Sequence, residues 1–126
     1  MNEPAGPLVL VVDDDARSRE LMRLVLSHAG YRVLAAPEAH SALDMLQIER
    51  PVLLLADFRM PGMNGLEFCR RVRSRPELAG LRFVLLTGMD DDETRAGARA
   101  AGADAVVTKP FDRMDLLAQL SKLLAA

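Results

Sequence analysis

The sequence predicts an α/β domain in which a five-stranded parallel sheet is covered by helices on both faces. Three observations lead to this class. Short apolar runs alternate strictly with longer amphipathic segments along the 126 residues, which is typical of repeated strand–helix units. The apolar runs are continuous, as expected for parallel strands buried on both faces. Beyond a short N-terminal lead, no repeat or linker divides the chain into two domains.

The first unit begins at the first apolar run. We expect a buried strand over 8–12, where the sequence is LVLVV, and a helix over 15–29. The helical residues expected on one face are Leu21, Leu24, Val25 and His28. Gly30 is a suitable helix stop, and the second strand is expected over 31–36, before Pro37.

The middle of the chain predicts a second helix, a third strand and a third helix. The second helix, over 38–50, has apolar residues at i, i+3, i+4 and i+7: Ala39, Ala42, Leu43 and Leu46. The third strand, VLLLA over 52–56, reaches Asp57 and leads into the loop 58–65, which contains two turn signals. The third helix, over 66–74, is expected to turn three side chains inward: Leu66, Cys69 and Val72.

The last two units follow the same alternation. A fourth strand over 81–86 reaches Thr87. The fourth helix, over 90–101, is rich in alanine and carries little apolar bulk, so we expect it to be one of the less stable elements. A fifth strand over 105–107 precedes the last helix, 111–125, which has leucines along one side: Leu116, Leu117, Leu120, Leu123 and Leu124.

Composition and charge exclude several classes of function. A net charge of −2 leaves no broad basic surface for nucleic acid, and no apolar run is long enough to cross a bilayer. The segment 1–7 lacks the features of a signal peptide; we expect a flexible lead followed by a domain over 8–126, in the cytoplasm. The single cysteine, Cys69, excludes an internal disulfide and a multi-cysteine metal site.

Polar residues gather where the predicted strands end. The first strand is followed by aspartates at 13–15, and the third by Asp57. Thr87 follows the fourth strand and Lys109 the fifth, whereas the second offers no polar group. In open parallel sheets, ligands bind at the carboxyl ends of the strands, where the strand order reverses. We therefore predict a flavodoxin-like three-layer sandwich of order 2-1-3-4-5, which brings these strands together and leaves the second at the edge.

This set of groups suits phosphoryl transfer onto an aspartate. Clustered carboxylates repel one another and need a cation, and oxygen ligands without His or Cys favour Mg²⁺. A carboxylate can attack phosphorus, a lysine binds phosphate oxygens, and a threonine hydroxyl donates to them. Asp15 is expected to act differently, as an acid at the start of the helix.

Four segments of the chain together resemble the receiver domain of response regulators in two-component signalling. They are VVDDDARSRELM with its acidic pair, LLLADFRMPGMNGLE with the phosphoacceptor loop, FVLLTG with its hydroxyl, and AVVTKPF with its Lys-Pro pair. Each is weak alone, but the four occur in the family's order on the matching strands. The resemblance covers nearly the whole chain.

The resemblance implies a role for each matching residue. Asp57 would be the phosphorylated aspartate, and Thr87 and Lys109 would contact its phosphoryl group. The ligands of Mg²⁺ would be Asp13, Asp14, Asp57 and the backbone carbonyl of Arg59. Of the acidic pair, Asp14 is expected to be the direct ligand.

Further positions are expected to modulate the site or to take part in a switch: Gly88, Met89, Val106 and Pro110. Lys109–Pro110 is similar to the family's cis peptide. The family often has Tyr or Phe three residues before the lysine, where this chain has Val106. Rotation of an aromatic ring is therefore not expected to report the switch here.

Arg59 stands two residues after Asp57, and Met89 stands two residues after Thr87, at positions that vary in the family. Both are expected to border the acyl phosphate. Our hypothesis is that Arg59 pairs with the acidic cluster and hinders attacking water. The lifetime of the phosphorylated state would then be longer.

The resemblance also implies partners. The phosphodonor would be a phosphohistidine on a histidine kinase or phosphotransfer protein. An output domain or a separate protein would read the face formed by the fourth helix, fifth strand and fifth helix. No direct contact with nucleic acid or with a membrane is expected, and the only reactions expected are phosphorylation and dephosphorylation of the chain itself.

Three alternatives remain open at this stage. The chain fits either a free-standing regulator or the receiver module of a hybrid histidine kinase. An aspartyl-phosphate hydrolase of the haloacid-dehalogenase type also uses Asp, Mg²⁺ and Lys, but it usually has a second Asp where this chain has Arg59. A receiver that acts as a scaffold without phosphorylation is disfavoured by the complete set of acids, threonine and lysine.

Overall fold

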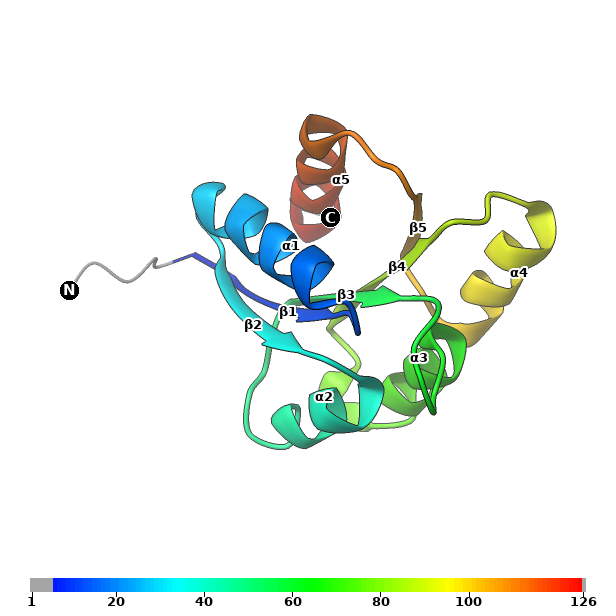
Figure 1. Ribbon diagram of the computed structural model, residues 1–126. Helices are drawn as coiled ribbons and strands as arrows, with labels where there is room; N and C mark the ends of the chain where they lie inside the picture. The colour runs from blue at the N-terminus through cyan, green and yellow to red at the C-terminus, as the bar shows by residue number, and fades with distance from the viewer. Residues whose placement is uncertain (1–5, 126) are drawn as a thin grey trace.

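The computed structural model describes residues 6–125, and its centre is a five-stranded sheet in the order β2-β1-β3-β4-β5 (Figure 1). All neighbouring strands are parallel. The strands are β1 (Leu8–Val12), β2 (Arg32–Ala36), β3 (Leu53–Asp57), β4 (Arg82–Thr87) and β5 (Ala105–Thr108). The predicted fold class and strand order are confirmed.

Helices cover both faces of the sheet. They are α1 (Ala16–His28), α2 (Ala39–Met45), α3 (Gly65–Arg73), α4 (Asp92–Ala101) and α5 (Arg113–Ala125), with a short 3₁₀ turn, η1 (Pro76–Leu78). Figure 1 shows α1 and α5 on one side of the sheet and α2 and α3 on the other. Successive residues of β1 point to opposite faces, so Val9 and Val11 pack with α1 and α5 while Leu10 and Val12 pack with α2 and α3.

Strand register brings the functional ends of the strands level with one another. Val12 lies opposite Ala56, which places the residues that follow β1 beside the end of β3. Thr87 at the end of β4 lies opposite Thr108, the residue before Lys109. The polar residues predicted to meet at one edge therefore emerge from neighbouring positions.

Helix α1 is rotated relative to the sequence prediction. Leu21 and Leu24, expected on the core face, are 63% and 43% exposed, whereas Met22 and Leu26 are buried against the sheet. The helix carries two adjacent apolar stripes, and periodicity alone does not say which one meets the core.

The other differences concern element boundaries. α2 ends at Met45 rather than at residue 50, and the chain leaves it in tight turns in which Ile48 N–H donates to the Met45 carbonyl. Ile48 is 84% exposed, so its side chain makes no core contact that would favour continuation of the helix. In α3, Phe68 is fully buried, which the prediction missed.

Helix α4 begins two residues later than predicted and has a thin core face. Asp91 caps it by accepting a hydrogen bond from Thr94 N–H at 2.7 Å. Its buried side chains are only Thr94, Ala98 and Ala101, as expected from its alanine content. In residues 6–125, no helix is both long and apolar enough to cross a membrane.

Candidate functional site

The side chains predicted to act together converge at the carboxyl edge of the sheet. Asp13 directly follows β1, and Asp57 is the last residue of β3. Thr87 is the last residue of β4, and Lys109 directly follows β5. Four neighbouring strands of the sheet, β1, β3, β4 and β5, thus position one group each within a single site.

Three carboxylates form the acidic part of the site. One carboxylate oxygen from each of Asp13, Asp14 and Asp57 lies within 4.8 Å of the others. Asp13 is buried, Asp57 is half-buried and Asp14 is exposed, so the cluster is open to solvent on the Asp14 side. Three hard oxygen donors without nitrogen or sulfur ligands fit Mg²⁺, which binds carboxylates while keeping several waters.

The pKa of the Asp13 carboxyl reflects both its burial and its charged neighbours. Burial raises the pKa of the Asp13 carboxyl, and the negative charges of Asp57 and Asp14 raise it further. A hydrogen bond from Asp15 N–H and the positive charge of Lys109 oppose this rise. A cation at the cluster would remove the repulsion that favours the protonated form.

Asp15 has the separate role predicted for it. Its carboxylate caps α1 by accepting hydrogen bonds from Arg17 N–H at 3.0 Å and from the Ser18 hydroxyl at 3.2 Å. The bond from Arg17 is the main cause of the lowered pKa of Asp15. Asp15 is therefore engaged in helix capping and not in the acidic cluster.

Lys109 makes the direct cationic contact with Asp57. The distance between Lys109 Nζ and Asp57 Oδ1 is 2.7 Å, and the side chains are 33% and 15% exposed. The backbone N–H of Lys109 donates to the Thr87 carbonyl at 2.7 Å, which holds the ends of β4 and β5 together. The Lys109–Pro110 peptide is cis, as predicted.

The Thr87 hydroxyl faces the loop that precedes α4. The side chain of Thr87 is almost fully buried, and its Oγ1 accepts a hydrogen bond from Met89 N–H at 3.0 Å. A cavity of about 270 Å³ adjoins Asp57 and is lined by Asp57, Phe58, Arg59, Leu86, Thr87, Gly88, Met89 and Lys109. This cavity brings together the phosphoacceptor candidate, Arg59 and two of the four positions predicted to modulate the site, Gly88 and Met89.

Two predicted positions behave differently from the rest. Arg59 is exposed at the rim of this cavity, and within residues 6–125 no ion pair joins its guanidinium to the acidic cluster. Val106 lies on β5 opposite Leu85 and packs against the core, and it is not among the residues that line the cavity.

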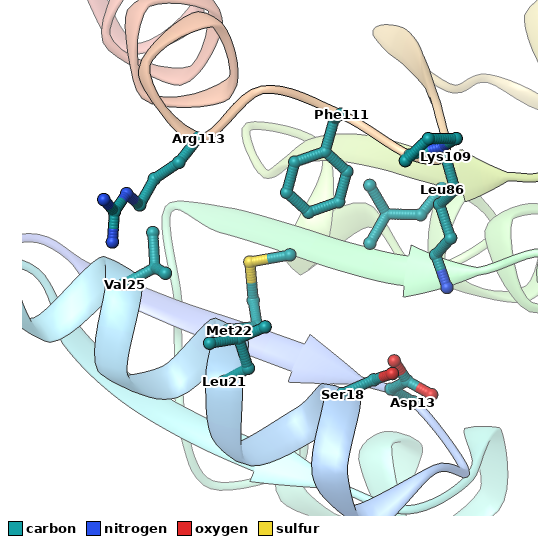
Figure 2. Close-up of a pocket in the computed structure, with 10 residues that line it drawn as sticks. Asp13, Ser18, Leu21, Met22, Val25, Leu86, Lys109, Phe111 and Arg113 are labelled. Atoms are coloured by element: carbon teal, nitrogen blue, oxygen red, sulfur yellow. The ribbon is translucent and has the colours of Figure 1, made fainter.

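A second, larger cavity lies between α1 and the loop from β5 to α5, and the sequence did not predict it. Its volume is about 710 Å³, and its lining includes Leu21, Val25, Leu86 and Phe111. Figure 2 shows Asp13, Ser18 and the Lys109 ammonium at one end of this groove, with Val25 and Arg113 at the other. The feature of the sequence that could have indicated this cavity is the second apolar stripe of α1.

Comparisons with known proteins agree with the geometry. The protein-family model for the "Response regulator receiver domain" matches residues 9–121. The chain is 42% identical over 116 residues to the response regulator MprA of Mycobacterium avium; the match covers 92% of this chain and 50% of that protein. The chain thus spans about half the length of the curated relatives that it matches first.

Two solved structures show the same fold. The chemotaxis response regulator CheY4 of Vibrio cholerae has a TM-score of 0.89 and 31% identity, with 94% of this chain and 99% of that chain covered. The signal receiver domain of a signal transduction histidine kinase from Syntrophus aciditrophicus has a TM-score of 0.88 and 28% identity, with 95% and 91% covered. The similar proteins thus include receivers from different kinds of signalling protein.

Proposed function

The chain belongs to the response regulator receiver domain family of two-component systems, and on this premise we propose that it accepts a phosphoryl group on Asp57. The observation that carries the proposal is the contact of 2.7 Å between Lys109 Nζ and Asp57 Oδ1, beside the Asp13 and Asp14 carboxylates. A carboxylate that contacts one lysine, lies beside two further acids and lines a cavity is placed for attack on an incoming phosphorus.

The proposed reaction takes the phosphoryl group from a phosphohistidine of a histidine kinase or phosphotransfer protein. A carboxylate oxygen of Asp57 attacks phosphorus, a P–O bond forms and the P–N bond breaks, and the leaving imidazole takes up a proton. Lys109 neutralises negative charge on the phosphoryl oxygens, and the Thr87 hydroxyl donates a hydrogen bond to one of them.

The residues that would hold Mg²⁺ are Asp13, Asp14, Asp57 and the backbone carbonyl of Arg59. When bound, Mg²⁺ would supply positive charge next to the phosphoryl oxygens during transfer. The proposal is supported by the three carboxylate oxygens, one from each aspartate, that lie within 4.8 Å of one another.

We propose that the conformational switch passes through the loop between β4 and α4. As the Thr87 hydroxyl moves to donate to a phosphoryl group on Asp57, it would shift Met89, whose N–H donates a hydrogen bond to it. The next residue, Asp90, forms an ion pair of 2.8 Å with Arg95 on α4. Movement of Thr87 is therefore passed on to α4. This helix is easy to displace because few of its side chains are buried in the core.

The phosphorylated state would then be read at the face formed by α4, β5 and α5. With Val106 in place of a large ring, no aromatic rotation takes part. The reader would be an output domain, since the chain spans about half of its curated relatives, or a separate protein. A receiver module within a hybrid histidine kinase is a second setting, favoured by the similarity to a kinase receiver domain.

Treatment with a small phosphodonor tests the proposed function. The purified chain with Mg²⁺ and acetyl phosphate should gain the mass of one phosphoryl group, measured by intact mass spectrometry. Beryllofluoride, which mimics the phosphoryl group, should shift the backbone NMR signals of Gly88 and of α4. Both effects should be absent in Asp57→Asn, which preserves the size of the side chain.

Each alternative predicts a different result. Rapid multiple turnover of small phosphoesters would indicate a hydrolase and would contradict the proposal. An absence of any adduct, with the chain folded and Mg²⁺ bound, would indicate a scaffold and would also contradict it. A stable adduct that depends on Asp57 supports the receiver function.

A further inference from the structure

Arg19, in the first turn of α1, reaches back across the turn that carries the acidic residues. Its Nη1 donates a hydrogen bond of 2.9 Å to the backbone carbonyl of Asp13. Within residues 6–125, the Arg19 guanidinium forms no ion pair with a carboxylate. The cation is thus directed at a neutral acceptor, and Arg19 itself occupies none of the carboxylate oxygens of the acidic cluster.

The contact with Arg19 is one of three that hold Asp13. The Asp13 N–H donates to the Ala36 carbonyl on β2 at 3.1 Å. The Asp13 carboxylate accepts a hydrogen bond of 2.9 Å from Asp15 N–H. Together with the Arg19 contact, these bonds tie the amide, the side chain and the carbonyl of Asp13 to three different parts of the chain.

Asp14 has no comparable support of its own. Its side chain is exposed and forms no hydrogen bond with residues 6–125. Its position depends on the backbone on either side. The peptide that joins Asp13 to Asp14 is planar, so a bond that fixes the Asp13 carbonyl also fixes the direction of the Asp14 amide and the place of its Cα.

Electrostatic repulsion among the carboxylates favours a movement of the backbone that the hydrogen bond from Arg19 opposes. The carboxylates of Asp13, Asp14 and Asp57 repel one another at the separations found here, and the turn can relieve the repulsion by rotating the peptide that precedes Asp14. An arginine paired with Asp14 itself would prevent the rotation but would occupy the oxygens that a cation needs. An arginine that binds the Asp13 carbonyl prevents the rotation and leaves the Asp14 carboxylate oxygens open to a cation.

We propose that Arg19 is a positioning residue for the metal site: it fixes the peptide plane between Asp13 and Asp14 and so presents the Asp14 carboxylate to Mg²⁺. This inference rests on the proposed function, because it concerns the Mg²⁺ site of the receiver. Partners that orient metal ligands commonly affect metal affinity by one or two orders of magnitude.

Titration calorimetry with Mg²⁺ alone, in the absence of a phosphodonor, tests the inference. Arg19→Gln should bind Mg²⁺ about tenfold more weakly than the unmodified chain. Arg19→Lys, which keeps the charge and a single donor, should recover part of the loss. Arg17→Gln and Arg23→Gln serve as matched controls, since each removes one positive charge from α1 without a side-chain contact to Asp13, and both should stay within about twofold.

A metal-free measurement separates positioning from a general loss of stability. In Arg19→Gln without Mg²⁺, the amide of Asp15, which donates to the Asp13 carboxylate, should exchange its hydrogen faster. The buried amides of β3 should exchange at the same rate as in the unmodified chain. If Arg19→Gln does not fold, the same pair of measurements on Arg19→Lys decides the question.

The outcomes distinguish this inference from the function beneath it. If the unmodified chain does not bind Mg²⁺, the proposed metal site and the inference both fail. If it binds Mg²⁺ and Arg19→Gln binds equally well, the inference alone is wrong. It is also wrong if Arg17→Gln weakens binding as much as Arg19→Gln, because charge alone would then explain the effect.

Discussion

Asp13, Asp14 and Asp15 are neighbours in the chain but occupy three different environments. Asp13 is buried beside Asp57, Asp14 is exposed at the open side of the cluster, and Asp15 caps α1. The differences arise because the chain turns from β1 into α1 within these residues. Three identical side chains are thereby given separate tasks by the local backbone.

The first prediction concerns Asp14 and Asp15. Asp14→Asn should weaken Mg²⁺ binding by at least about tenfold, because it removes a charged ligand from the site. Asp15→Asn should change the affinity little, since asparagine also caps helices. Titration calorimetry measures both, and equal effects of the two substitutions would show that the metal ligands have been assigned wrongly.

The second prediction concerns Arg59 at the rim of the cavity beside Asp57. Without an ion pair in residues 6–125, its side chain is free to shield the acyl phosphate from water. Arg59→Ala should therefore speed the loss of the phosphoryl group from Asp57, measured by mass spectrometry after the donor is removed. An unchanged rate would show that Arg59 does not affect the lifetime of the phosphorylated state.

The third prediction concerns the pH dependence of Cys69. Burial raises the pKa of its thiol from 9.0 to about 11, and the thiol donates to the Ala101 carbonyl at 3.4 Å. Below pH 9 the thiol is protonated in the folded and the unfolded chain, so its full contribution to stability is present. As pH rises from 9 to 11, the unfolded chain loses the proton first and the contribution declines.

Urea unfolding of the unmodified chain and of Cys69→Ala at several pH values measures this effect. The difference between their free energies of unfolding should shrink above pH 9. A difference that stays constant up to pH 11 would contradict the raised pKa.

At the scale of secondary structure, α4 combines a firm C-terminal end with a thin core face. Its last turn ends at Gly102, whose φ of 103° is suited to glycine, and Arg73 of α3 donates to the Gly102 carbonyl at 2.9 Å. Arg73 also forms an ion pair of 2.7 Å with Asp104 in the connection to β5. Movement of α4 is therefore expected at its N-terminal end, next to the Thr87 loop.

The fourth prediction uses two glycines of this element. Gly97→Ala should raise the free energy of unfolding by about 0.5–1 kcal/mol, because alanine favours the helix interior and its Cβ would meet Leu66 at an ordinary 3.5 Å. Gly102→Ala should lower it, since φ is +103° there and a Cβ would come within 2.7 Å of Arg73. Chemical denaturation compares the two, and destabilisation by Gly97→Ala would mean that α4 packs more tightly against α3 than this contact indicates.

At the scale of the whole molecule, the site joins ends of strands that are far apart in the chain. Residues 13, 57, 87 and 109 meet only when the parallel sheet is complete. Repulsion among the carboxylates acts against this assembly, and the ion pair between Lys109 and Asp57 offsets part of it. Binding of a cation at the carboxylates would consequently be linked to folding.

The fifth prediction follows from this linkage. Mg²⁺ at 100 times its dissociation constant should raise the free energy of unfolding by about 2.7 kcal/mol. Sodium chloride at matched ionic strength should give a smaller gain, because it screens the charges without binding in the site. Thermal unfolding of the chain and of Asp14→Asn checks this, and an equal response to both salts would argue against a specific metal site.

The sequence by itself determined the alternation of strands and helices, the polar residues that end the strands and, through their placement, the strand order. These features are readable because burial on both faces leaves continuous apolar runs, and because the ends of parallel strands share one edge. The pattern of strand ends is therefore sufficient to place Asp13, Asp57, Thr87 and Lys109 together.

Only the tertiary structure decided which stripe of α1 meets the sheet, where the Thr87 hydroxyl points and that Arg19 holds the Asp13 carbonyl. Periodicity describes a helix without its rotation, and a short polar side chain has several local partners within reach. Which contact forms depends on strand register and on neighbouring elements. Those are set by packing between segments that lie far apart in the chain.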